Sequence, residues 1–282
     1  MIFNMKFRFA IIFFLSALLF PVKAQDHLSI QFGYANNLFN SKLYFDAITE
    51  YKRLQFFDSA KTYNYDLNFK IGECYKAGAK YDFAVKYFSF AELSARNDDE
   101  YYDSKTQIIR TNILRRTTDR ALQLCDELEK DQRFISKKDE INYWRGWTYI
   151  FADDWEKAAK SFAKINFRHE LKIFAEQTDK AKVSVTFAKV ISYILPGSGA
   201  IYCGKFLSGL MSLGWNFLAG FWTINSFVED RIFDGVVIAE LVWLRFYRGA
   251  IQNAEEFAVE KNLEVANKSL RYLQNEYKGI KP

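Results

Sequence analysis

The sequence predicts an all-α protein, in which a solenoid of helical hairpins is followed by an apolar helical hairpin. Three observations favour this fold class. A pattern of small and aromatic residues recurs every 37 residues through the first half of the chain. Half of the 282 residues are hydrophobic, yet only 3 prolines and 13 glycines occur, few for a β-protein rich in turns. Late in the chain, residues 206–228 contain no charge.

Residues 1–24 predict a secretory signal. Lys6 and Arg8 precede an apolar run of about a dozen residues, which is short for a membrane span. Ala24, a small residue, then lies just before the polar Gln25. A basic start, a short apolar core and a small residue at the end are typical of a cleaved signal peptide. An uncleaved anchor is the alternative, and both interpretations export the residues that follow.

Four helix pairs are predicted because one residue pattern keeps a constant spacing. Ala47, Ala84, Ala121 and Ala158 are each 37 residues apart, and most have an aromatic or apolar residue three positions before and four after. These neighbours share one helical face. A single pair cannot bury that face, so the pairs are expected to stack into a solenoid. The predicted helices cover residues 28–40, 43–57, 63–78, 80–95, 99–115, 117–131, 137–152 and 154–165, with a capping helix at 167–182.

This pattern resembles the tetratricopeptide repeat, best in residues 65–91 and 139–165. The resemblance implies that the first helix of each pair lines a concave face that binds a protein or peptide partner. Polar and aromatic side chains on that face include candidates for hydrogen bonds and for apolar anchors. The alternative for the aromatic ones is packing against a neighbouring helix. The predicted partner-binding residues are Asn36, Phe69, Glu73, Arg110, Tyr143 and Trp147.

After residue 182 the chain becomes apolar. Residues 183–255 are predicted to form a membrane-associated helical module, and residues 256–282 an amphipathic helix. A helix over residues 206–228 would be on the order of 34 Å long, enough to span the apolar core of a bilayer. The next apolar segment, residues 235–251, contains Glu240. A carboxylate there indicates a partner or a role, unless the segment lies at an interface or helix neighbours satisfy the charge.

A proline–glycine turn opens this module. Its pattern, proline-glycine-x-glycine-x-x-tyrosine-x-glycine, is formed by Pro196, Gly197, Gly199, Tyr202 and Gly204. It resembles the turn of a membrane module found in bacterial envelope proteins, some of which carry tetratricopeptide repeats. The resemblance implies architecture and location but no activity. A tight turn that lets helices pack is the favoured interpretation. A phosphate-binding loop is the alternative, but the lysine-serine/threonine ending of such loops is missing.

Patterns of catalytic residues are missing from the sequence. Only 2 histidines and 3 widely spaced cysteines occur, and no nucleophile elbow or dinucleotide fingerprint is found. We therefore predict that the protein is not an enzyme and has no metal, cofactor or small-molecule substrate. Residues 25–182 carry nearly equal numbers of basic and acidic side chains, so no nucleic-acid partner is predicted.

The predicted function is a non-catalytic scaffold or adaptor, exported to the bacterial cell envelope and facing the periplasm. Residues 25–182 would bind a protein partner, and the module at 183–255 would hold the chain at a membrane. The alternative is a membrane-embedded subunit of a transport or assembly machine, in which the hairpin is the active part. Basic residues flank the hairpin and favour cytoplasmic flanks. The export signal, which acts first, favours the opposite side.

Overall fold

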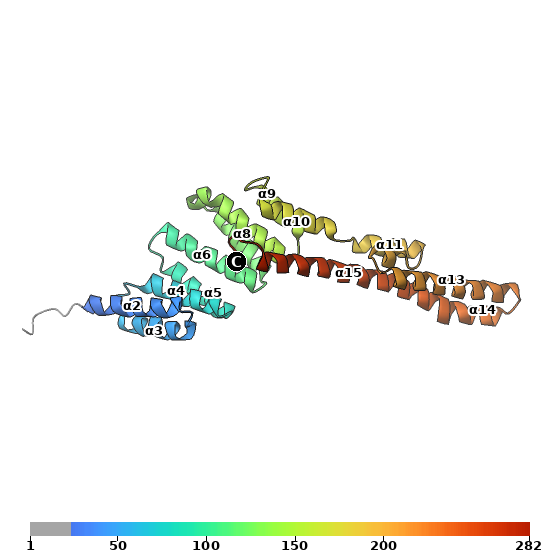
Figure 1. The fold of residues 1–282 in the computed structure, drawn as a ribbon, viewed down its shortest axis with the longest axis horizontal. Coiled ribbons are helices and arrows are strands. Elements are labelled where there is room, and N and C mark those ends of the chain that lie inside the picture. Colours follow the sequence, from blue (N-terminus) through green and yellow to red (C-terminus); the bar gives the residue numbers. More distant parts are fainter. Residues whose placement is uncertain (1–23) are drawn as a thin grey trace, which may run out of the picture. The chain divides into compact units, whose positions relative to one another are not determined.

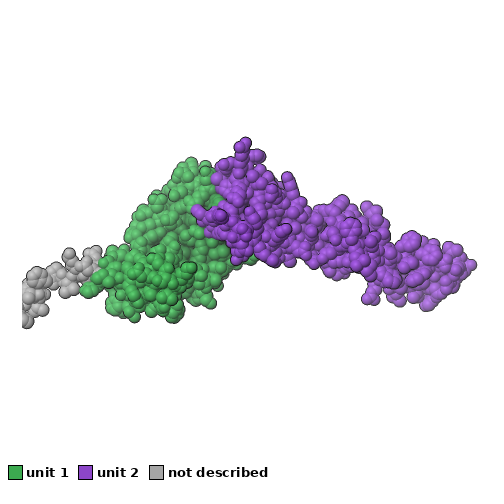
Figure 2. Space-filling model, viewed as in Figure 1, with its two compact units in different colours: residues 1–151, 282 green, residues 152–281 purple. Residues whose placement is uncertain are grey.

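The computed structural model describes residues 24–282, and in that range all regular secondary structure is helical, with no strand (Figure 1). The predicted signal sequence lies outside the described residues except for Ala24. Two compact units divide the chain (Figure 2). Unit 1 ends at Phe151 and also includes Pro282, and unit 2 comprises Ala152–Lys281.

Unit 1 consists of successive helix pairs, as the repeat predicts. The observed bounds agree with the predicted ones to within a few residues, so the all-α prediction is confirmed. The division between the units separates α8 from α9, the two helices of the fourth predicted pair. The helices of unit 1 are α2 (Ala24–Asn40), α3 (Tyr44–Phe57), α4 (Asn64–Ala77), α5 (Tyr81–Leu93), α6 (Asp98–Leu114), α7 (Thr118–Lys130), the 3-10 helix η1 (Gln132–Lys137) and α8 (Lys138–Phe151).

The turn inside each pair repeats its backbone conformation along with the sequence. Lys42, Ala79, Arg116 and Asp153 have positive φ angles of 62°, 55°, 61° and 61°, and they too are 37 residues apart. In the first three turns, the next residue donates its N–H to the carbonyl five positions earlier, as Lys80 does to Tyr75 at 2.8 Å. A left-handed residue with such a bond is a common way to end a helix. The period is therefore a property of the backbone as well as of the side chains.

Small residues bring the helices of unit 1 close together. Ala47, Ala84 and Ala121 are fully buried. A Cβ on Gly72 of α4 would lie 2.7 Å from the ring of Phe88 on α5, so only glycine allows this approach. Gly72 therefore lies directly against an aromatic residue of the second helix of its own pair.

Unit 2 holds the apolar module. Its helix α13 has the predicted bounds, and the helix α15 runs continuously through the predicted domain boundary at 255/256. The cause is a run of buried small residues, including Ala250, Ala254 and Ala258, which continues the helix past the change in composition. The helices are α9 (Trp155–Ala163), α10 (Glu170–Ala181), α11 (Val185–Ile194), α12 (Ser198–Tyr202), α13 (Phe206–Val228), α14 (Ile232–Ile238), the π-helical turn η2 (Ala239–Trp243) and α15 (Leu244–Asn275).

The proline–glycine turn lies where α11, α12, α13 and α15 meet. Gly197 has a φ of +97°, and a Cβ on it would overlap the carbonyl of Gly209. A Cβ on Gly199 would lie 2.6 Å from the Cβ of Ala254 and would overlap the carbonyl of Ala188. The turn therefore depends on glycine for close helix packing.

The other predicted turn residues terminate or support these short elements. Pro196 follows the end of α11, and Gly204 has a φ of +86° just after α12. The Tyr202 hydroxyl accepts a hydrogen bond from the N–H of Ser184 at 3.2 Å. Tyr202 also packs edge-on against Phe187, with ring centroids 5.1 Å apart.

In residues 24–282, no helix combines the length and the apolar character needed to cross a membrane. The helix predicted over residues 206–228, α13, is within that range. The helix has the expected length, but Asn216, Thr223 and Asn225 lower its mean hydropathy. Glu240 lies in the π-helical turn, where it is exposed.

Candidate functional site: a cation cluster on unit 1

Half-buried cationic side chains connect three consecutive first helices of unit 1. Lys76, near the end of α4, donates a hydrogen bond from Nζ to Oε1 of Gln107 on α6 at 3.1 Å. Arg110, one turn further along α6, lies over the ring of Trp144 on α8, with 4.7 Å between its guanidinium carbon and the ring centroid. We call Lys76, Gln107, Arg110 and Trp144 the cation cluster.

The two cations of this cluster repel each other, which makes the charged form of Lys76 less favourable. Burial and, to a smaller extent, the nearby Arg110 charge lower the pKa of Lys76 from 10.5 to about 7, whereas Glu73 opposes the shift. Burial also lowers the pKa of Arg110. The carboxylate of Glu73 is 2.7 Å from Nζ of Lys70, so its charge is shared with another lysine. A site of this kind favours an incoming anion, because a negative group would offset both charges.

The cluster contains one of the six predicted partner-binding residues and borders two others. Arg110 belongs to it, and Glu73 lies one turn from Lys76 on α4. Tyr143 packs edge-on against Trp144, with ring centroids 5.1 Å apart, and is partly exposed. These three residues remain accessible enough to contact a partner.

The other three predicted residues are engaged in packing. Asn36 accepts a hydrogen bond from the hydroxyl of Tyr51 at 2.6 Å. Phe69 packs against Tyr65 and Phe88, with centroid distances of 5.7 and 5.5 Å. Trp147 is only 2% exposed. For Phe69 and Trp147 the packing alternative describes the observed contacts.

Sequence reasoning missed Lys76, Gln107 and Trp144. The signal for two of them was available in the helical spacing. Lys76 follows Glu73 by three residues, and Gln107 precedes Arg110 by three, so each pair shares a helical face. Trp144 is adjacent to Tyr143 in sequence, and its position under Arg110 depends on how α6 and α8 pack.

Nucleophilic and metal-binding groups do not add to this site. Burial raises the pKa of the Cys74 and Cys125 thiols to about 12, which keeps both in the unreactive thiol form at neutral pH. Within the described part of the chain, no group of three or more histidine, cysteine, aspartate or glutamate side chains is placed to hold a metal ion.

Comparisons with known proteins do not assign the chain to a family. No family model matches it, and neither curated proteins nor solved structures give a match. The resemblances to the tetratricopeptide repeat and to the bacterial membrane module stay predictions.

Proposed function

We propose that this protein is a non-catalytic adaptor of the bacterial cell envelope. Unit 1 binds an acidic segment of a protein partner at the cation cluster, and the hairpin of α13 and α14 holds the chain at a membrane. The single observation that carries the proposal is the inverted distribution of side chains on α13. Most of its small and polar residues are buried, and most of its large apolar residues are exposed.

The inversion extends over the length of the helix, with Ser208 and Gly214 as exposed exceptions. The buried positions of α13 are Gly209, Asn216, Ala219, Gly220, Thr223 and Ser226. Large apolar side chains that are more than half exposed on α13 are Phe206, Leu207, Leu210, Met211, Phe217, Phe221, Ile224 and Val228. A helix on the surface of a water-soluble protein has the opposite arrangement. Helices that pack inside a membrane use small residues at their contacts and turn large apolar ones outward.

The exposed apolar surface continues from α13 onto the next elements. Ile232 and Phe233 at the start of α14 are 65% and 80% exposed, and Leu241 in the π-helical turn is 68% exposed. Contacts such as the stacking of Trp215 on Phe246, with centroids 5.5 Å apart, hold α13 against α15. A continuous apolar surface over several helices differs from hydrophobic residues that are exposed singly, and it indicates that an apolar phase covers it. We infer that lipid is that phase.

Charges lie at both ends of this surface. In the turn between α13 and α14, Arg231 pairs with Glu229 at 2.7 Å. At the opposite end of α13, Lys205 pairs with Glu260 of α15 at 3.0 Å. An apolar stretch between two charged ends suits a hairpin that lies along a lipid surface, with its apolar side in lipid and its charged ends in water.

For unit 1, the proposal depends on charge complementarity. Lys76 and Arg110 together form a half-buried positive centre, and the partly exposed Tyr143 supplies aromatic surface beside it, while Trp144 is buried under Arg110. Arginine and aromatic residues are frequent at binding hot spots. Carboxylates of a glutamate- or aspartate-rich segment are therefore the groups that this surface fits.

Flotation with liposomes tests the membrane half. The full chain should float with phosphatidylglycerol–phosphatidylethanolamine vesicles, and the double variant Phe217→Glu, Ile224→Glu should stay at the bottom of the gradient. Both positions are exposed, at 74% and 60%, so folding does not require them. Phe56→Glu, at an 81% exposed position of unit 1, is the control and should float normally. Equal flotation of the double variant would refute membrane attachment through α13.

Peptide binding tests the partner half. A fluorescent peptide of alternating glutamate and alanine should bind the full chain, and its glutamine counterpart should bind far more weakly. Lys76→Met should weaken binding of the acidic peptide by at least about fivefold, as expected for a charged hydrogen bond. Equal binding of both peptides would refute an acidic partner segment.

A further inference from the structure

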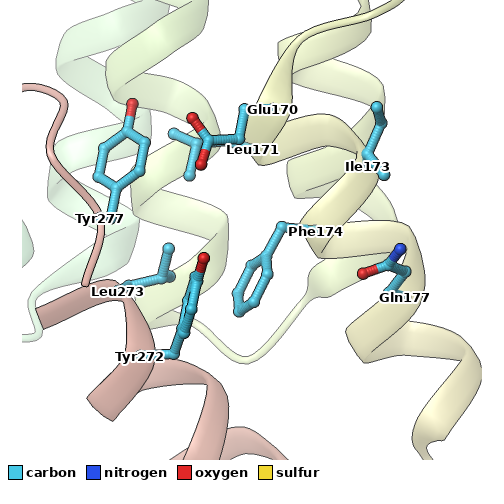
Figure 3. Close-up of a pocket in the computed structure, with 8 residues that line it drawn as sticks. All are labelled: Glu170, Leu171, Ile173, Phe174, Gln177, Tyr272, Leu273 and Tyr277. Carbon is cyan, nitrogen blue, oxygen red and sulfur yellow. The ribbon is translucent and has the colours of Figure 1, made fainter. Parts of the chain in front are cut away.

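A recess of about 190 Å³ lies in unit 2 between α10 and the C-terminal end of α15 (Figure 3). The buried side chains of Leu171 and Leu273 form its apolar base. The aromatic rings of Phe174, Tyr272 and Tyr277 surround it, and the Glu170 carboxylate lies beside it. The recess is smaller than usual pockets for cofactors or drug-sized ligands, and its volume suits a single side chain.

Several contacts hold the aromatic walls in place. Phe174 and Tyr272 stack with ring centroids 5.0 Å apart. One helical turn away, the hydroxyl oxygens of Thr178 and Ser269 are 3.1 Å apart and share a hydrogen bond between α10 and α15. A Cβ on Gly279 would overlap the ring of Tyr277, so the chain after α15 closes tightly over that residue. The recess is therefore preformed, which reduces the entropic cost of binding.

The charge beside the recess is negative. Glu170 is exposed at the start of α10. The nearest lysine in sequence, Lys172, pairs instead with Glu176 at 3.0 Å and lies over the Phe167 ring. Among residues 24–282, no ion pair involves the Glu170 carboxylate. A carboxylate and several aromatic rings thus meet around one small apolar recess.

We propose that this recess binds the cationic side chain of an arginine or lysine from a partner polypeptide. Both side chains carry an aliphatic stem that packs on apolar surface and a charged head that stays polar. The stem would contact Leu171 and Leu273, and the head would lie against the aromatic rings and the Glu170 carboxylate. Aromatic faces attract cations, and a carboxylate adds a charge-assisted hydrogen bond. The site is in unit 2 and selects the opposite charge from the cation cluster, so it stands independently of that assignment.

Tyrosine-selective NMR on the full chain in detergent micelles tests the proposal. Ring carbons are labelled with ¹³C, and the Tyr272 resonance is assigned from the variant Tyr272→Phe. The probes are N-acetyl-arginine methylamide and N-acetyl-lysine methylamide. Their neutral counterparts are N-acetyl-citrulline methylamide and N-acetyl-norleucine methylamide. The cationic probes should shift the Tyr272 resonance saturably, and the neutral ones should not.

Variants then test whether the Glu170 carboxylate contributes to binding. Glu170→Gln should weaken binding of the arginine probe about fivefold. The matched control is Glu156→Gln, which removes an acid from the first turn of α9 and should leave the affinity unchanged. Equal binding of citrulline and arginine in the wild type, or unchanged affinity in Glu170→Gln, would overturn the proposal. Binding of tetramethylammonium alone, without either side-chain probe, would also overturn it in favour of a small quaternary cation.

Discussion

Lys76 should make the stability of unit 1 depend on pH in a window where few other groups titrate. Its pKa is about 7 in the folded protein and 10.5 in an unfolded chain. Between these values the unfolded state binds more protons than the folded state, so the free energy of unfolding rises with pH. The slope for one such group approaches about 1.4 kcal/mol per pH unit. From pH 7 to pH 9 the gain is therefore about 2 kcal/mol.

Comparison of the wild type with Lys76→Met isolates this effect. Guanidinium unfolding is followed through the tryptophan fluorescence of the full chain at pH 7, 8 and 9. The wild type should gain stability across this range relative to Lys76→Met, whose side chain fills similar space without a charge. The range stops at pH 9 because there the Cys74 and Cys125 thiols of the unfolded chain begin to ionise. Parallel stability profiles for the two proteins would refute the burial of an ionisable lysine at this position.

Three further substitutions test the packing. Ala84→Leu, at a fully buried position, should overpack the α4–α5 pair and cost on the order of 1–3 kcal/mol in urea unfolding, and unchanged stability would contradict the repeat register. Ala79→Gly should relieve the positive φ of its turn and stabilise the protein by up to about 1 kcal/mol, whereas a loss of stability would refute the left-handed conformation. Gly199→Ala should destabilise unit 2 by at least about 1 kcal/mol, because its Cβ would overlap Ala188. A neutral result in thermal unfolding would count against that close approach.

The helices of unit 1 were predictable because two independent patterns agree. The alanine spacing fixes the register, and the breaks between apolar stretches fix the ends. α5 illustrates the result, with predicted bounds of 80–95 and observed bounds of Tyr81–Leu93. The course of α15 was harder to predict, because composition changes from apolar to charged near residue 254. Burial in this part of α15 depends on small residues, and these contribute little to a hydropathy average.

The candidate site was predictable in part. The repeat register places Glu73 and Arg110 on the first-helix face, and in the structure the Glu73 charge is close enough to act on Arg110 of the cation cluster. The register cannot tell which side chains on that face turn into the core, because this depends on the neighbouring helix. Trp147 is the clearest case, since it occupies the same repeat position as Arg110 but is buried.

Hydropathy also could not predict which side of α13 is buried. The uncharged run located the helix and its length, but its polar residues gave no indication of which side they occupy. In the structure Asn216, Thr223 and Ser226 are all buried. Thr223 donates its hydroxyl to the carbonyl of Ala219 at 2.8 Å, which satisfies that polar group within the helix. Most of the polar side chains that lower the mean hydropathy are therefore on the inner side, and the outer side is mainly apolar, with Ser208 and Asn225 as exceptions.

The two roles of Lys76 predict opposite responses to pH, and this opposition is the most specific consequence of the proposed function. Stability should rise above pH 7, because the folded protein loses an unfavourable buried charge. Binding of an acidic peptide should weaken over the same range, because it requires the protonated ammonium. With a free-state pKa of about 7, the charged fraction falls about fivefold between pH 7 and pH 8, and affinity should follow. Fluorescence anisotropy with the glutamate peptide measures this, and Lys76→Met should remove the dependence. Affinity that stays constant while stability rises would place the bound peptide away from Lys76.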